Sequence, residues 1–336
     1  ALSAQGRSEL LLEKNWKFTR EDNNEFIKPA FDDSKWQSVT VPHDWAIYGP
    51  FSSLNDKQEV AISQDGQKEA MEHAGRTGGL PFVGVGWYRT EFDVPQFQAG
   101  KRATILFDGA MSHANVYING QKVGYWPYGY NSFHFDITKY LKPGEKNTLA
   151  VRLENLPESS RWYPGAGLYR NVHLIITEDA YIPVWGTYIT TPSVNEKFAK
   201  VNVRTKVVLP EGADPAKYSV ETSVWNPNKQ KLTAVRTSLA QMKYNNNQAE
   251  QEFVIQAPSL WSPEMPALYS AETRLYEGDK LKDIYTTPFG IRSIEIIPDK
   301  GFFLNGKRTV FKGVCNHHDL GPLGAAVNDA AIRRQI

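Results

Sequence analysis

The side chains best suited to polar chemistry lie in two short segments near opposite ends of the chain. Asp44 stands within the run Val41-Pro42-His43-Asp44-Trp45, and His317, His318 and Asp319 are consecutive near the C-terminus. A carboxylate can accept hydrogen bonds from two adjacent hydroxyls, and an imidazole can donate to a hydroxyl or accept from one. The structural alternatives are a turn-capping aspartate and loop histidines that bond only the backbone.

The run 317–319 also contains residue types that bind metal ions. Adjacent residues on an extended loop point in different directions, and no second cluster of ligands lies nearby in the sequence. A closed metal site usually needs about four convergent ligands. We therefore predict no metal site and no cofactor within this chain.

Aromatic residues are numerous, with 9 Trp, 16 Tyr and 16 Phe. Their rings suit β-rich cores, and they also stack on the apolar faces of sugars. Trp126, Tyr128 and Tyr130 lie close together after an expected hairpin strand and could form such a stacking surface. Because core and sheet-edge packing is the commoner use of these rings, we expect these three to be structural.

Three regions must position these side chains, and the first, residues 1–181, has a β pattern. Residues 103–107 and 133–137 show apolar residues at period two, and Asn119-Gly120 is a strong hairpin signal. Strands at this spacing predict a sandwich or jelly roll. Residues 51–84 are polar and rich in glycine, which predicts a long loop with one helical turn near residues 68–73.

The second region, residues 182–291, predicts an immunoglobulin-like sandwich. Apolar and polar residues alternate in three segments, at 201–207, 218–224 and 269–275. About seven short strands fit the region, as in an immunoglobulin-like fold. The cysteine pair typical of antibody domains is absent, so the likeness is to the architecture alone.

The third region, residues 292–336, begins with a hairpin signal at Asn305-Gly306 and continues with an apolar run at 310–314 that predicts a buried strand. Cys315, the single cysteine, is expected in that buried strand. Asn328 can cap a helix over 330–336. Strand, loop and helix make the first unit of an α/β arrangement, which cannot bury its strand alone, so we expect a truncated domain.

Composition and charge argue against several functional classes. The 336 residues carry a formal net charge of +1 without a long basic run, which argues against nucleic acid or an anionic membrane as the main partner. No apolar stretch of about 18 residues predicts a membrane span.

Several ordered motifs resemble those of family 2 glycoside hydrolases, and they extend over almost the whole chain. The motifs are Val41-Pro42-His43-Asp44-Trp45, Gly84-Val85-Gly86-Trp87-Tyr88-Arg89, Arg161-Trp162-Tyr163-Pro164-Gly165-Ala166-Gly167-Leu168-Tyr169-Arg170, Leu260-Trp261-Ser262-Pro263, Phe289-Gly290-Ile291-Arg292 and Phe311-Lys312-Gly313-Val314-Cys315-Asn316-His317-His318-Asp319. The resemblance implies a jelly-roll sugar-binding domain (1–181), an immunoglobulin-like sandwich (182–291) and the start of a catalytic TIM barrel (292–336). It is closest to β-galactosidase-like enzymes of Bacteroides-type gut bacteria.

This resemblance implies a retaining β-glycosidase that is periplasmic or secreted. Such enzymes use two carboxyl groups about 5–5.5 Å apart, one as acid/base and one as nucleophile. In the family, both are glutamates on later barrel strands, so we expect no catalytic residue before Ile336. The partner implied is a β-galactoside or a related saccharide, and family members often form homo-oligomers through these domains.

The resemblance also implies which residues touch sugar. Asp44 would reach the mouth of the barrel and bond sugar hydroxyls, and His317 would contact the sugar after the first barrel strand. His318 and Asp319 would orient His317 or shape its loop. Some β-galactosidases carry an aspartate near the position of Arg161, and its absence here puts a galactose preference in doubt; Arg161 could bind sugar or form a structural ion pair.

Three functions remain open from the sequence. The chain is an enzyme fragment, a free-standing carbohydrate-binding module, or a structural interaction module. The unfinished unit at the C-terminus favours the first. β-Galactosidase, β-glucuronidase and β-mannosidase share the architecture, so the fold does not identify the sugar.

Overall fold

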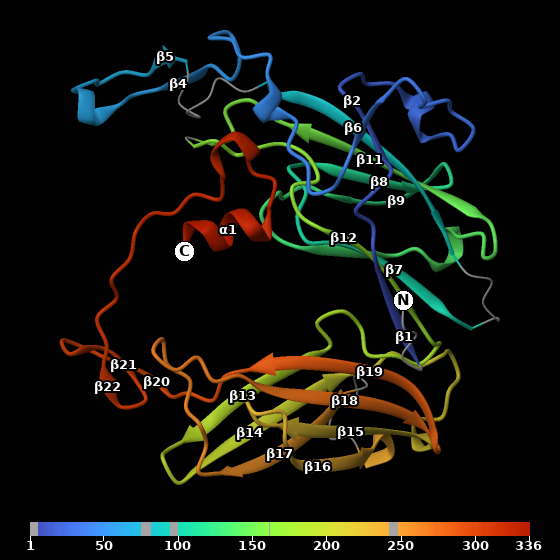
Figure 1. The fold of residues 1–336 in the computed structure, drawn as a ribbon, viewed down its shortest axis with the longest axis vertical. Coiled ribbons are helices and arrows are strands. Elements are labelled where there is room, and N and C mark those ends of the chain that lie inside the picture. The colour runs from blue at the N-terminus through green and yellow to red at the C-terminus, as the bar shows by residue number, and fades with distance from the viewer. Residues whose placement is uncertain (1–5, 75–81, 95–99, 161, 242–247) are drawn as a thin grey trace. The chain divides into compact units, whose positions relative to one another are not determined.

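The computed structural model describes residues 6–74, 82–94, 100–160, 162–241 and 248–336. It divides into two compact units (Figure 1): residues 1–8 with 177–315, and residues 9–176 with 316–336. The mainly β fold class expected from the sequence is confirmed. Within the described ranges, no helix has the length and apolar character needed to cross a bilayer.

The unit containing residues 9–176 is a two-sheet sandwich. Its sheets have the strand orders β1-β12-β7-β10 and β3-β2-β6-β11-β8-β9. The strands are β1 (Arg7–Leu11), β2 (Trp16–Thr19), β3 (Gln37–Val39), β6 (Gly84–Asp93), β7 (Arg102–Phe107), β8 (Ala114–Ile118), β9 (Gln121–Trp126), β10 (Phe133–Asp136), β11 (Lys146–Asn155) and β12 (Val172–Thr177). Short 3₁₀ turns occur at η1 (Asn24–Ile27), η2 (Ala46–Tyr48) and η4 (Thr138–Tyr140).

The central ladder of this sandwich joins β6 and β11, which lie side by side in Figure 1. They pair antiparallel from Gly84 opposite Asn155 to Asp93 opposite Lys146. Alternate side chains of the strands enter the core, where Tyr88 and Leu149 are fully buried. Burying one large apolar side chain contributes roughly 1.5–3 kcal/mol, so this core is the main source of stability.

Local turn chemistry explains the β8–β9 hairpin. Asn119 and Gly120 both have positive φ, 51° and 82°. A two-residue turn of this type needs positive φ at both central positions, which asparagine and glycine tolerate best. The hairpin predicted from the sequence is confirmed.

The long segment after residue 51 contains a small hairpin in place of the helical turn expected at 68–73. Strand β4 (Gln58–Val60) pairs with β5 (Met71–His73), and η3 (Ser63–Asp65) lies between them. The prediction of a helical turn was wrong because an isolated turn is marginally stable, whereas the backbone of β5 finds hydrogen-bond partners on β4.

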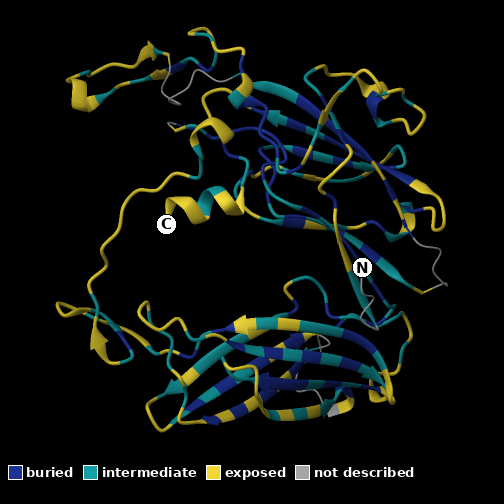
Figure 2. Cartoon of the chain, in the orientation of Figure 1, coloured by how far each residue is buried: buried dark blue, intermediate teal, exposed yellow. Residues whose placement is uncertain are grey.

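The second unit contains the predicted immunoglobulin-like sandwich. Sheets β13-β14-β17 and β16-β15-β18-β19 supply seven strands among its described residues. These are β13 (Thr187–Val194), β14 (Phe198–Lys206), β15 (Tyr218–Trp225), β16 (Lys231–Ser238), β17 (Gln248–Gln256), β18 (Tyr269–Glu277) and β19 (Lys280–Phe289), with turns η5 (Pro215–Lys217) and η6 (Leu239–Gln241). Buried and more exposed residues alternate along most of these strands in Figure 2.

The C-terminal region differs from the prediction in one important respect. A small sheet of β20 (Ile294–Ile297), β21 (Gly301–Leu304) and β22 (Lys307–Arg308) contains the predicted hairpin at Asn305-Gly306. The run 310–314, expected to be a buried strand, has no regular secondary structure, and Val314 is 90% exposed. Cys315 is exposed as well. A strand is buried only where neighbouring strands or helices cover it, and none of the described residues of this unit does so for 310–314.

The chain ends with η7 (Gly321–Leu323) and helix α1 (Asp329–Gln335). The side chain of Asn328 accepts a hydrogen bond from the backbone N–H of Ala331, as expected of an N-cap. The predicted cap is confirmed, and the helix begins one residue earlier than the expected range.

Candidate functional site

Asp44 lies at the centre of a buried junction between three segments of the first sandwich unit. Its side chain is only 1% exposed and accepts four hydrogen bonds. Oδ1 accepts from the backbone N–H groups of Ala46 and Ala166, both at 2.9 Å. Oδ2 accepts from the Tyr163 hydroxyl at 2.6 Å and from the backbone N–H of Ala325 at 2.8 Å. These four donors use about all the acceptor capacity of a carboxylate.

The electrostatics of this junction combine opposing effects. Burial raises the pKa of Asp44, while the four hydrogen bonds oppose that rise. Burial and the neighbouring Asp44 carboxylate also raise the pKa of Tyr163, which therefore stays a hydroxyl donor at neutral pH. Asp44 thus acts in this structure as an anchor that holds residue 325 against the loop at 163–166.

Two glycines allow this close approach. A Cβ atom added at Gly165 would lie 2.3 Å from the Cβ of Ala325 and 2.9 Å from Oδ2 of Asp44. A Cβ at Gly324 would lie 2.3 Å from the same oxygen. Both contacts are closer than side-chain atoms can approach, so glycine is required on both sides of the carboxylate.

Residues 317–319, here called the histidine loop, lie against the same sandwich. His318 Nε2 lies 3.0 Å from the carbonyl oxygen of Pro164, and its ring is edge-on to Tyr130 with centroids 5.7 Å apart. The exposed His317 ring lies 6.5 Å from that of Trp162, at an interplanar angle of 86°. Asp319 is close enough to raise the pKa of Tyr163. Four predicted site residues therefore lie around the segment 162–166. They are Asp44, His317, His318 and Asp319.

Arg161, the fifth predicted site residue, lies outside the described residues. Its neighbours at 162–166 are described, and they contact both Asp44 and the histidine loop.

Surface aromatic residues border the histidine loop. Tyr128, Tyr130 and Trp162, here called the aromatic rim, are adjacent: Trp162 Nε1 donates to the Tyr130 hydroxyl at 3.0 Å, and the two tyrosine rings are 5.6 Å apart. Trp126 instead packs on the core beside Phe133. The structural role expected of Trp126 agrees with this packing, whereas Tyr128 is exposed next to the site.

Sequence reasoning assigned no role to Tyr163 or to residues 324–325. Tyr163 belongs to a quoted motif, but nothing local indicates that its hydroxyl donates to Asp44. Residues 324 and 325 are separated from Asp44 by most of the chain, and only the tertiary structure brings them together.

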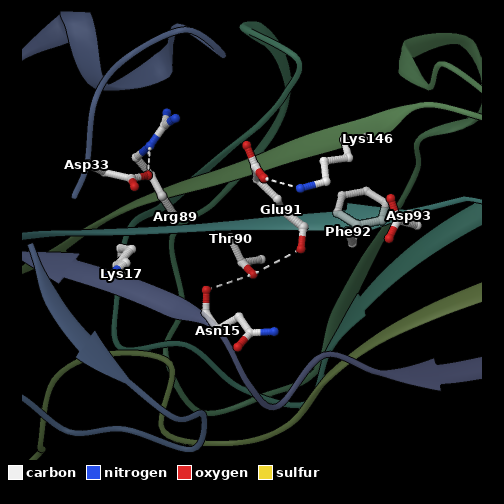
Figure 3. Close-up of a pocket in the computed structure, with 9 residues that line it drawn as sticks. All are labelled: Asn15, Lys17, Asp33, Arg89, Thr90, Glu91, Phe92, Asp93 and Lys146. Atoms are coloured by element: carbon white, nitrogen blue, oxygen red, sulfur yellow. Dashed lines mark hydrogen bonds and ion pairs between the residues drawn. The ribbon is translucent and has the colours of Figure 1, made fainter.

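A second polar depression lies on the outer face of the six-stranded sheet (Figure 3), with a volume of about 360 Å³. Four of its six charged side chains form two ion pairs: Arg89 Nε donates to Asp33 at 2.8 Å, and Lys146 lies 3.3 Å from Glu91. The buried Arg89 guanidinium also donates to backbone carbonyls, including that of Lys28 at 3.2 Å. Such internal pairing indicates a structural network.

Among the residues that the structure describes, no group of three or more His, Cys, Asp and Glu side chains is arranged to hold a metal ion. The histidine loop and the aromatic rim offer hydrogen-bonding groups beside flat rings. This combination suits a ligand with hydroxyl groups and apolar faces.

Comparison with known proteins gives two family matches in chain order. Residues 10–178 match the family described as glycosyl hydrolases family 2, sugar binding domain, and residues 181–292 match glycosyl hydrolases family 2. The chain is 40% identical over 323 residues to beta-galactosidase BoGH2A of Bacteroides ovatus, covering 96% of this chain and 36% of that protein. It is 36% identical to a putative beta-glucuronidase of Formosa agariphila, covering 98% of this chain and 29% of that protein.

Solved structures show the same likeness. A family 2 member from Bacteroides cellulosilyticus has a TM-score of 0.84 at 34% identity, covering 97% of this chain and 41% of that one. A β-glucuronidase from Bacteroides uniformis has a TM-score of 0.79 at 28% identity, covering 98% and 38%. The chain therefore spans about a third of the length of the two curated relatives.

Proposed function

Because this chain belongs to glycosyl hydrolase family 2, we propose that it forms the non-catalytic N-terminal portion of a retaining, exo-acting β-glycosidase. The observation that carries this proposal is the ordered match of both domains over a chain that spans only about a third of its curated relatives. The two carboxyl groups of a double-displacement mechanism would then lie on a barrel that continues beyond residue 336.

In this proposal, residues 1–181 and 182–291 are the two accessory domains, and residues 292–336 begin the TIM barrel. The two family matches, over residues 10–178 and 181–292, support the first two parts of this division. His317 supplies a hydrogen bond to the sugar, because its ring is exposed beside Trp162. His318 and Asp319 shape the loop that holds it. Arg161 stays a proposed sugar-binding residue on the strength of its motif alone.

We assign Asp44 a positioning role in this proposal. Its carboxylate oxygens already accept four protein hydrogen bonds, so a sugar hydroxyl would have to displace one of those donors. Asp44 therefore fixes the loop that presents His317 and His318.

The proposed substrate is a terminal β-galactoside, and the proposed location is the periplasm or the cell exterior. The relative with 40% identity is named a beta-galactosidase, which supports the sugar. A β-glucuronide is the second candidate, because a relative with 36% identity is named a putative beta-glucuronidase.

Nitrophenyl glycoside assays test the proposal in two steps. The 336-residue chain at high concentration should release no nitrophenol from β-galactoside, β-glucuronide or β-mannoside. The protein expressed from its complete reading frame should hydrolyse the β-galactoside with retention of configuration. Turnover by the 336-residue chain would overturn the non-catalytic assignment, and a preference for the β-glucuronide would overturn the sugar.

A further inference from the structure

An open groove of about 630 Å³ lies beside the edge strand of the six-stranded sheet, and neither the histidine loop nor the aromatic rim contributes a lining residue. It is formed by β2, β3 and the segments that flank them. Its lining residues are Lys14, Asn15, Trp16, Lys17, Gln37, Ser38, Val39, Thr40, His43 and Tyr48. The volume is within the range of small-molecule sites, about 300–1,000 Å³.

The wall of this groove contains a buried side chain with an unmatched polar atom. His43 is only 7% exposed, and its Nε2 has no hydrogen-bond partner among the described residues. Its Nδ1 lies 2.7 Å from the hydroxyl of the fully buried Tyr88. Burial lowers the pKa of His43 to about 4, so the ring is neutral at neutral pH and carries one N–H.

The Tyr88 hydroxyl decides which nitrogen carries that hydrogen. Its oxygen receives a hydrogen bond from the backbone of Leu168, which leaves its own proton for His43 Nδ1. The opposite tautomer would leave both the tyrosine proton and Nε2 without a partner. The ring is therefore protonated on Nε2, and this donor has no acceptor within the part of the chain that the structure describes. A buried donor without an acceptor loses its hydration without compensation, which favours a ligand that brings an acceptor.

The exposed Tyr48 ring covers this histidine. The two rings are nearly parallel, at 19°, with centroids 5.9 Å apart, and Tyr48 is 67% exposed. Rotation of an exposed side chain takes picoseconds to nanoseconds, so Tyr48 can swing aside and admit a ligand to Nε2. Its ring then offers an aromatic face to the apolar face of a sugar.

The charge of the groove selects the kind of acceptor. Two of the ten lining residues, Lys14 and Lys17, are positively charged, and none is acidic. Lys17 uses one N–H to bond the Ser38 hydroxyl at 2.9 Å and keeps two others. The positive charge of Arg20 also acts on His43. The Asp44 carboxylate acts on the Tyr88 hydroxyl beside His43, but four hydrogen-bond donors already hold that carboxylate. An anionic oxygen acceptor therefore fits this groove better than a neutral one.

We propose that this groove binds a uronic acid residue of an acidic saccharide, with its carboxylate facing Lys14 and Lys17, an oxygen accepting from His43 Nε2, and its ring against Tyr48. This site lies next to the Asp44 junction, because the Tyr48 hydroxyl acts electrostatically on that of Tyr163, but its lining residues differ from those of the histidine loop. It does not depend on the glycosidase assignment, because the argument uses only the residues of the groove.

Titration of the 336-residue chain with glucuronic acid, followed by NMR, tests this proposal. We expect saturable shifts that include the His43 Nε2–H resonance. Responses to methyl β-galactoside, which lacks the carboxylate, and to acetate, which lacks the sugar ring, should be much weaker. Tyr48→Ala should weaken binding by roughly 5-fold through the lost ring contact. Lys14→Ala should weaken it by roughly 3-fold, as expected for an exposed ion pair.

Matched controls isolate the groove. Tyr188→Ala removes a similarly exposed tyrosine from the immunoglobulin-like sandwich, and Lys146→Ala removes an exposed lysine of the depression in Figure 3. Both should bind glucuronic acid like the unmodified chain. Absence of saturable binding, equal binding of methyl β-galactoside, or unchanged binding by Tyr48→Ala would each overturn the proposal.

Discussion

The Oδ2 atom of Asp44 accepts a hydrogen bond of 2.8 Å from the backbone N–H of Ala325, a residue 281 positions further along the chain. This contact joins the C-terminal segment to the first sandwich unit, and the 2.6 Å bond from Tyr163 holds the same carboxylate oxygen in place. Asp44 therefore fixes residue 325, while His318 makes its own contact with Pro164.

Replacing this carboxylate by an amide should be costly. In Asp44→Asn, the amide NH₂ faces backbone or hydroxyl donors that need an acceptor. Hydrogen bonds to a charged group are worth about 1.5–3 kcal/mol each, so we expect a loss of about 2–3 kcal/mol in the free energy of unfolding. Urea unfolding of the variant and the unmodified chain measures this loss in the free energy of unfolding. The exposed Asp136, which accepts from the Thr138 backbone N–H, gives the control Asp136→Asn, expected to lose under about 1 kcal/mol. Equal losses in the two variants would contradict the anchor role.

Glycine substitutions can separate backbone strain from steric contact. Gly165 and Gly212 have similar φ angles, +69° and +73°, but a Cβ at Gly165 meets Ala325 and Asp44 whereas one at Gly212 meets nothing within 4 Å. Alanine at either position should cost about 1–2 kcal/mol from the left-handed backbone. Gly165→Ala should cost a further ~1–3 kcal/mol, as overpacking does. Thermal unfolding of both variants checks this difference, and similar Tm values would show that the junction is loosely packed.

His173 should make stability depend on pH. Its Nδ1 lies 2.8 Å from Glu9 and its Nε2 3.1 Å from Asp108, and these carboxylates raise its pKa from 6.5 to about 9. Because the folded pKa is raised, the stabilisation is fully present below pH 6.5 and is lost as pH rises through 9. Urea unfolding from pH 6 to 9.5 should show the unmodified chain more stable than His173→Asn at the acidic end, with the difference falling towards zero. A constant difference across this range would contradict the assignment.

His317 should affect substrate binding in the protein expressed from its complete reading frame. If its imidazole bonds the sugar, His317→Ala loses one hydrogen bond, which corresponds to a rise in KM of about 3–10-fold. The control His113→Ala removes a histidine whose ring bonds the Tyr125 hydroxyl and no residue of the histidine loop, and its KM should not change. An unchanged KM in His317→Ala would remove His317 from the proposed site without affecting the family assignment.

Local sequence was sufficient for several elements of the fold. The β8–β9 turn follows from the tolerance of Asn119 and Gly120 for positive φ, and the cap of α1 follows from the side chain of Asn328. The strands of the second sandwich follow from apolar residues at period two, because alternate side chains enter one core. Each of these features depends on neighbours that are close in the sequence.

Other features required contacts that no local pattern encodes. Residues 310–314 have the composition of a buried strand, yet they are exposed because burial depends on neighbouring strands. Met71–His73 forms a strand only because Gln58–Val60 pairs with it.

The sequence by itself determined the family motifs, the two β-sandwiches and the candidate residues around Asp44 and His317. Only the tertiary structure decided that Asp44 is an anchor with four internal donors, and that Nε2 of the neighbouring His43 is buried without a partner among the described residues. The physical reason is that a side chain's hydrogen-bond partners and burial are set by residues distant in sequence, which periodicity and spacing do not specify.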